Sequence, residues 1–360
     1  MKKIVATALI MLSLTAYAAE SGKQVAAKFN DFTVSYILPK TVIDIEVELE
    51  LTQLKAGPYA NYSQKYLGIP AKVTDDSRRW RLVSANAKVS SIPDKEASYS
   101  VQLKSGATPY VYINEEGVLL AVNAEPIIEN NNVVEEQESE LTSSPLDDES
   151  YSYALTEEML LSGSNIKMAE LAAKQIYRIR ESRTDIITGE SDQQFDGEAL
   201  KIMMQQLDEQ ENRLTVMFTG TKQTQRKTIK IRWIPEGACD DVVVARVSEK
   251  DGLVDSDNLS GEPIYISLNN VKRATYPLDS KGLPFVLPEN SIIYNIPGEA
   301  QLSLTYQGEN IFGQKVDLTQ FGVKFGLAPK LFVDKKTQTY MVLHPTTGAI
   351  KEIGQKVLSE

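Results

Sequence analysis

The sequence predicts a mainly β protein with a helical hairpin, in which two antiparallel β-sandwich or barrel-like domains are joined through an acidic linker and helices. Three observations predict this fold class. Alternating apolar and polar residues occur toward both ends of the chain, and this period of two places one face of a strand in a core and the other in water. Two central stretches carry the spacing of amphipathic helices. A strongly acidic stretch precedes those helices.

Residues 19–124 are predicted to form an N-terminal β domain. Within Ile43–Leu51, apolar residues alternate strictly with acidic ones. This alternation is typical of an antiparallel sheet with one solvated face, because buried parallel strands read as continuous apolar runs. Farther along, Tyr110–Ile113 and Val118–Val122 flank the short polar connection Asn114–Gly117. A connection that ends in glycine between two apolar runs predicts a hairpin.

The stretch 125–150 is predicted to be an acidic linker or long loop. It contains nine acidic residues and no basic one. Such a segment buries too little apolar surface to offset the entropy cost of ordering it. The alternative is a cation-binding loop, but the acidic residues lack the regular spacing of a calcium-binding loop.

Residues 151–215 are predicted to form a helical hairpin. Apolar residues recur at steps of three and four in Asn165–Glu181, without proline or glycine. Asp196 is placed to act as the N-cap of a second helix, whose apolar stripe continues to Leu214. The polar stretch Arg183–Glu190 is interpreted as part of the connection between the two helices.

The remaining residues, 216–360, are predicted to form a C-terminal β domain. Apolar residues alternate with polar ones in 214–218 and again in 229–233, and Gly220 interrupts the pattern. Further short apolar segments follow, separated by Gly, Pro, Asn and Asp turns. Many short strands with such turns favour a sandwich or a barrel-like sheet.

Residues 1–18 have the organisation of a secretory signal peptide. Lys2 and Lys3 form a positive start, the apolar run 4–14 follows, and the small residues of 16–18 precede the expected cleavage between Ala18 and Ala19. The apolar run is shorter than the roughly 20 residues that span a bilayer. We therefore expect an exported protein of the periplasm or cell surface.

The mature chain is expected to carry neither a lipid anchor nor a transmembrane segment. A lipoprotein has a cysteine directly after its cleavage site, where this chain has Ala19 and Glu20. No later segment reaches the apolar length of a membrane span.

Composition makes several chemistries improbable. The formal charge is −11, which disfavours nucleic-acid binding, and the only histidine and only cysteine are His344 and Cys239. A multi-histidine metal site, an intrachain disulfide and a thiolate zinc site are therefore not expected. The Gly-x-Ser-x-Gly, HExxH and phosphate-loop motifs do not occur either. We expect no catalytic residue, no metal and no cofactor.

An aromatic block provides the first group of candidate ligand-binding residues. Tyr59, Tyr62 and Tyr66 recur at steps of three and four, with Lys65 among them. One or two helical turns would present these rings on one face, where aromatic side chains stack on sugars or peptides. The alternative is that the tyrosines cover the edge of the first sheet, with buried rings and hydrogen-bonded hydroxyls.

Three arginines provide the second group of candidates. Arg178 and Arg180 near the end of the first predicted helix and Arg183 at the start of the connection lie close together in the sequence, a pattern that suits a carboxylate or phosphate ligand. The alternative is an intramolecular ion-pair network, with Glu181 and Asp185 as neighbours, that packs the hairpin on a sheet.

Several sequence blocks, taken in order, carry a family resemblance. They are 36–41 before the alternating strand, 57–68, 169–190, 196–201 and 218–220. With these blocks the chain resembles an exported Bacteroidetes family catalogued as domain of unknown function 4831. The resemblance implies an envelope protein and assigns no catalytic residues. The acidic stretch after Glu125 matches nothing in that pattern.

These observations predict a non-catalytic binding or assembly module of the cell envelope. The partner would be an envelope protein, a glycan or a peptide, and not nucleic acid. The alternative is a carbohydrate- or peptide-processing hydrolase with paired carboxylates, since acidic residues are abundant and a glycosidase needs two of them.

Overall fold

A computed structural model describes most of the chain. The described residues are 23–26, 32–103, 110–127, 154–190, 197–286, 290–333 and 337–357. The predicted signal peptide, with the cleavage site at Ala18 and Ala19, lies outside them. So does most of the predicted acidic linker, beyond residue 127.

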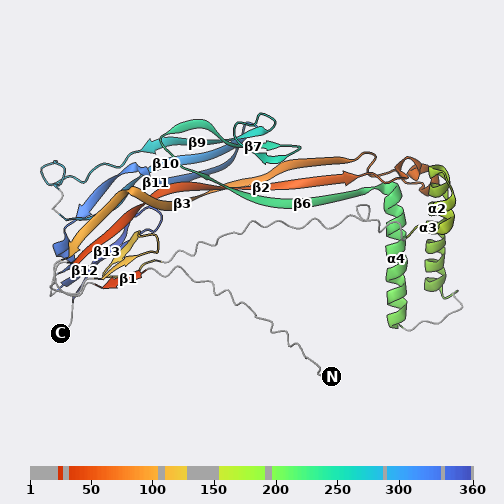
Figure 1. Cartoon of the computed structure of the whole chain (residues 1–360), viewed down its shortest axis with the longest axis horizontal. Coiled ribbons are helices and arrows are strands. Elements are labelled where there is room, and N and C mark those ends of the chain that lie inside the picture. The colour runs from red at the N-terminus through yellow and green to blue at the C-terminus, as the bar shows by residue number, and fades with distance from the viewer. Residues whose placement is uncertain are drawn as a thin grey trace, which may run out of the picture.

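A three-stranded antiparallel ribbon runs along the long axis of the molecule (Figure 1). Its strands, in the order β3–β2–β6, are β2 (Phe32–Lys55), β3 (Ser77–Leu103) and β6 (Thr221–Trp233). The predicted alternation in Ile43–Leu51 is confirmed, because its apolar side chains are buried and its acidic ones are not. Strand β2 therefore has one apolar and one charged face.

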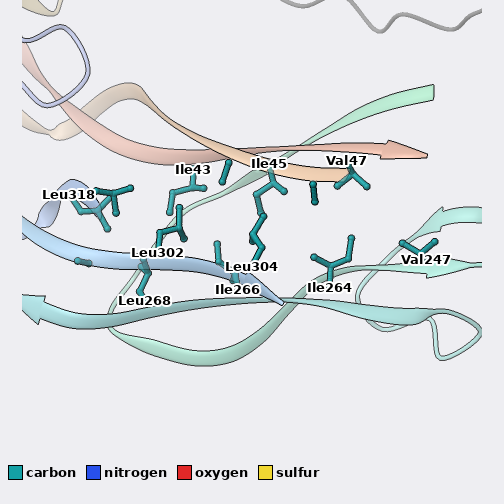
Figure 2. Close-up of a cluster of buried hydrophobic side chains, with 14 of the residues drawn as sticks. Ile43, Ile45, Val47, Val247, Ile264, Ile266, Leu268, Leu302, Leu304 and Leu318 are labelled. Carbon is teal, nitrogen blue, oxygen red and sulfur yellow. The ribbon is translucent and has the colours of Figure 1, made fainter. Parts of the chain in front are cut away.

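A five-stranded antiparallel sheet covers the apolar face of the ribbon. Its order is β11–β10–β9–β7–β8. The strands are β7 (Cys239–Ser248), β8 (Gly252–Val254), β9 (Glu262–Lys272), β10 (Ile292–Tyr306) and β11 (Glu309–Leu327). Figure 2 shows side chains such as Ile45, Ile266 and Leu304 pointing into the space between the two layers. This part of the molecule is a β-sandwich.

A second five-stranded sheet packs against the start of β2 and the end of β3. Its order is β1–β4–β5–β12–β13. The strands are β1 (Lys23–Ala26), β4 (Tyr110–Ile113), β5 (Leu119–Val122), β12 (Thr337–Leu343) and β13 (Ile350–Val357). A separate core joins Tyr36 and Leu38 of β2 to Leu119 and Met341 of this sheet, and to the short 3-10 helix Pro329–Phe332.

The predicted hairpin around Asn114–Gly117 is confirmed. Strands β4 and β5 pair antiparallel, with Val111 opposite Val122. The Asn114 side chain accepts a hydrogen bond from the Val118 backbone N–H at 2.7 Å. Gly117 has a φ of 87°, a left-handed conformation that favours glycine.

Strands from both predicted β domains share two of the three sheets. Strand β6 pairs with β2 from Ile43↔Trp233 to Lys55↔Thr221, and β12 pairs with β5. None of these sheets closes into a barrel. The division into domains 19–124 and 216–360 stays a prediction. The structure adds that each region supplies strands to sheets of the other.

The predicted helical hairpin is present, with two corrections to its limits. It consists of α3 (Asn165–Thr188) and α4 (Gly197–Thr219), preceded by α2 (Glu157–Leu161). Most of 183–190, expected in the connection, is helical, and α3 ends where Gly189 takes a φ of 75°.

The stretch 214–218, expected to be a strand, is the end of α4. Leu214, Met217 and Phe218 are buried at helical spacing, whereas Val216 is only half-buried. A short apolar run fits either period, and here the tertiary contacts of the helix decide it. The chain leaves the helix at Gly220, which has a φ of 71°.

Candidate binding surface at the helical tip

One end of the molecule consists of helices alone, and we call residues 57–68, 154–190 and 197–220 the helical tip (Figure 1). The connection from β2 to β3 contributes a 3-10 turn (Ala60–Tyr62) and α1 (Ser63–Leu67). It is joined to α4 by the Tyr59 backbone N–H, which donates to the Met217 carbonyl at 2.8 Å. The side-chain-free Gly57 makes this approach possible, since a Cβ there would lie 2.2 Å from the same carbonyl oxygen.

The helical tip brings the two predicted groups of candidate residues together. The tyrosine block follows β2 and the arginines lie on α3, more than a hundred residues later in the chain. Tyr177 of α3 lies between the two groups, and its hydroxyl donates to the Tyr66 carbonyl at 3.0 Å. The ring of Tyr177 also lies 5.7 Å from the guanidinium of Arg180.

The tyrosines differ in what they leave accessible. Tyr59 is only 2% exposed, and its ring centroid lies 5.4 Å from that of Phe218 in α4. Tyr62 and Tyr66 are half-buried, with ring centroids 6.2 Å apart, and the Lys65 ammonium lies 4.9 Å from the Tyr66 ring. Tyr59 is thus part of the core of the helical tip. Tyr62, Lys65 and Tyr66 retain exposed surface that a ligand could contact.

Two of the three candidate arginines bind carboxylates of α4. Arg180 Nε lies 2.7 Å from Glu211, and Arg183 bonds the other oxygen of Glu211 and lies 2.6 Å from Asp208. Partial burial opposes ionisation of Glu211, but the hydrogen bonds and charges of both arginines hold its pKa below the usual value. Arg178, in contrast, is exposed.

The ion pairs therefore hold α3 against α4. The sequence indicated Glu181 and Asp185 as acidic neighbours, and it is the facing helix that supplies the partners. This pairing depends on the register of two antiparallel helices, which no local sequence signal reveals.

The far half of the hairpin exposes large apolar side chains, one of which was expected in a core. The apolar stripe of the second helix includes Ile202, yet Ile202 is 57% exposed, and Ile187 of α3 is 69% exposed. Met203 and Leu207 are only half-buried. The buried residues of α4 are all in its last two turns. The apolar stripe of α4 extends beyond the part that packs in the core. Apolar side chains left exposed in this way are typical of a surface that binds a partner.

The ribbon that carries the helical tip has a charged face that is neutralised within itself. Asp44 bonds Arg232 at 2.7 Å, and Glu50 bonds Arg81 at 2.7 Å. Lys230 lies 3.4 Å from Glu46. Cations from both neighbouring strands thus compensate the acidic row of β2 and favour one register of the ribbon.

The resolved pKa shifts of carboxyl groups are all downward in the described ranges. Burial opposes the shift of Asp44, but hydrogen bonds from Arg232 and Ser90 lower its pKa, and the hydrogen bond from Arg81 lowers that of Glu50. Lysines act likewise on Glu170 and Glu299. A glycosidase acid needs a raised pKa. The hydrolase alternative stays a prediction that none of these shifts favours.

The lone cysteine and lone histidine lie apart from the helical tip. Burial raises the pKa of the half-buried Cys239 thiol at the start of β7, and the charge of Asp240 adds to the effect. His344 directly follows β12, and its backbone N–H donates to the Ala349 carbonyl at 2.8 Å. Over the described ranges, no cluster of three or more potential metal ligands occurs. Nor does any helix there combine the length and hydropathy of a membrane span.

Comparison with known proteins places most of the chain in one family. The model of a family described as a domain of unknown function (DUF4831) matches residues 33–351. No curated protein and no solved structure matches the chain.

Proposed function

The chain belongs to the family described as a domain of unknown function (DUF4831), and we propose that it is an exported, non-catalytic binding or assembly module of the cell envelope. The observation that carries this proposal is the exposed apolar surface in the far half of the α3–α4 hairpin, represented by Ile187 and Ile202. Large side chains of this kind lose contact with water when a partner covers them, and that burial drives association.

The architecture supports a role in presenting this surface. The helical tip stands at the end of a ribbon whose strands also take part in the two β cores (Figure 1). Ion pairs across the ribbon and between α3 and α4 hold the surface in a defined place. A surface that is already ordered before binding loses less conformational entropy when the partner binds.

A protein is the partner class that this surface fits best. Helices with an apolar stripe flanked by charged residues bind other helices or apolar grooves of proteins. A glycan or a peptide would instead stack on Tyr62 and Tyr66, which are half-buried and lie closer to the ribbon. We therefore propose an envelope protein as the partner.

The proposed export depends on the predicted signal peptide. N-terminal sequencing of the protein isolated from its native cells is expected to begin at Ala19, in an envelope or extracellular fraction. A chain that starts at Met1 in the cytoplasmic fraction would contradict export.

The binding surface is tested by capture with the mature chain from native envelopes. We expect Ile187→Asp and Ile202→Asp to reduce recovery of the protein partner at least about tenfold, because each places a charge in an apolar interface. Leu259→Asp is the matched control, since Leu259 is 82% exposed in the loop between β8 and β9. We call the three β-sheets together the β body.

Two results would overturn this assignment. One is a partner that all three variants retain equally. The other is recovery of glycan or peptide fragments alone, with no protein.

A further inference from the structure

A second exposed apolar surface lies at the opposite end of the molecule from the helical tip. The segment 273–286, which directly follows β9, protrudes there beyond the sheets (Figure 1). Its large apolar side chains are exposed, with Leu283 at 60% and Val286 at 91%. Tyr276, Leu278 and Phe285 are each more than half exposed. We call residues 273–286 the apolar loop.

The apolar loop is built as an ordered turn. The Asp279 backbone N–H donates to the Leu283 carbonyl at 2.7 Å, and Leu278 bridges Pro284. The Asp279 carboxylate accepts two backbone N–H groups, those of Lys281 and Leu283, at 2.8 and 2.9 Å. These hydrogen bonds order the backbone of the turn before any partner binds. Binding through the exposed apolar side chains therefore costs little further conformational entropy.

Aromatic contacts hold the base of the apolar loop to the sheet. The Phe285 ring lies 6.2 Å from that of Phe325 on β11, in an edge-to-face arrangement. The Ala274 backbone N–H donates to the Phe321 carbonyl at 3.0 Å. The loop thus has a fixed place relative to the β body.

The charges around the apolar loop are mainly positive, although the chain as a whole is acidic. Lys272, Arg273 and Lys281 are all exposed, and Lys272 lies 3.9 Å from Glu299 of β10, which also pairs with Lys315. The one acidic residue of the loop, Asp279, directs its carboxylate to the backbone of the turn. The Debye length is roughly 8 Å at physiological ionic strength, so distant charges are screened. The electrostatic potential at this end therefore depends on the local cations more than on the net charge of −11.

We propose that the apolar loop docks on the surface of a bilayer that contains anionic phospholipid. A protruding loop with exposed aliphatic and aromatic side chains inserts among lipid headgroups, and adjacent cations are attracted to anionic headgroups. A fluid lipid surface can adapt to the shape of such a protruding loop. The proposal is independent of the partner surface at the helical tip.

Vesicle flotation with the mature chain tests this proposal. Vesicles of equal parts phosphatidylcholine and phosphatidylglycerol are expected to carry the protein upward in a density gradient. Replacement of both Leu283→Ser and Val286→Ser is expected to reduce the bound fraction at least about tenfold, because the two most exposed apolar side chains of the loop are lost. Lys281→Glu is expected to weaken binding to these vesicles more than to pure phosphatidylcholine.

A second readout places a fluorophore in the apolar loop. The native tryptophans, Trp80 and Trp233, lie elsewhere, on β3 and β6. In a Val286→Trp variant, the added emission is expected to shift to shorter wavelength when anionic vesicles are added. Near-ultraviolet circular dichroism of each variant establishes that it is folded.

The controls separate this proposal from the proposed function. Ile202→Asp in the helical tip is expected to leave flotation unchanged, as is Leu259→Ser in the β body. Absence of flotation, or flotation that the loop variants do not alter, would overturn lipid docking and leave protein capture by the helical tip untouched. Capture of a protein through the apolar loop without vesicle binding would overturn it as well.

Discussion

At the scale of single residues, the same chemical type serves different purposes according to its neighbours. Arg178, Arg180 and Arg183 are similar in the sequence, yet two of them bind carboxylates of α4 and the third is exposed. The tyrosines divide in the same way, since Tyr59 is core and Tyr66 is accessible. The sequence places these residue types close together, but only the facing elements determine which of them remain available.

The Arg180–Glu211–Arg183 cluster makes a prediction about stability. Glu211→Gln is expected to lower the free energy of unfolding by about 1–3 kcal/mol, because two arginines lose a charged acceptor that is mostly shielded from water. Urea unfolding at neutral pH measures this loss. Glu170→Gln is the matched control on the exposed face of α3, and its unfolding curve is expected to stay close to that of the unmodified protein.

The same cluster makes a prediction about pH. The pKa of Glu211 is lowered in the folded protein, so its contribution is fully present above the unfolded value of about 4.3 and is lost as the pH falls through the folded pKa. The difference in stability between the unmodified protein and Glu211→Gln is therefore expected to shrink from pH 7 to pH 3. A difference that stays constant with pH would contradict this role of Glu211.

At the scale of elements, periodicity identifies strands and helices better than it identifies their ends. The strict alternation in 43–51 excludes a helix, and the structure agrees. The run 214–218 is short enough to fit both periods, and it is helical because Leu214, Met217 and Phe218 pack in the core of the helical tip. The change from helix to strand takes place at Gly220, where α4 meets the ribbon.

Gly220 is expected to be far less tolerant of substitution than a glycine with similar backbone geometry in open space. A Cβ at Gly220 would lie 2.7 Å from both the Lys55 carbonyl oxygen and the Val73 Cβ. Gly163 has a comparable φ of 62° and no atom within 4 Å of a Cβ.

Thermal and urea unfolding compare the two alanine variants. Gly163→Ala is expected to cost about 1–2 kcal/mol, from the left-handed backbone alone. Gly220→Ala is expected to cost at least about 1–3 kcal/mol more, because the backbone at the end of β2 and at Val73 must move. Equal losses of unfolding free energy in the two variants would contradict this prediction and would show that the α4–β6 junction at Gly220 accommodates a Cβ.

At the scale of the whole molecule, the strands before the helices and those after them are interdependent. Strand β2 has its apolar face against β9, β10 and β11 and has β6 along one edge. Strand β5 similarly lies between β4 and β12. A chain region that needs strands from beyond the helices to cover its apolar surface is not expected to be stable alone.

Separate expression of the two regions tests this interdependence. Fragments 19–150 and 151–360 are each expected to lack a cooperative thermal transition, and co-expression is expected to restore one. A single chain of residues 19–360 is the control. A fragment that unfolds cooperatively alone would instead support independent N-terminal and C-terminal β domains.

The order of apolar and polar residues along the chain was enough to predict the β class, the strand at 43–51, the hairpin at 110–122 and a helical hairpin, because each depends on local periodicity and turn chemistry. Strand partners between distant regions, the carboxylates that neutralise Arg180 and Arg183, and the exposure of Ile202 and Leu283 follow from contacts between residues far apart in sequence. Those contacts depend on which faces meet in three dimensions. No local pattern records that information, so both candidate binding surfaces became visible only in the folded molecule.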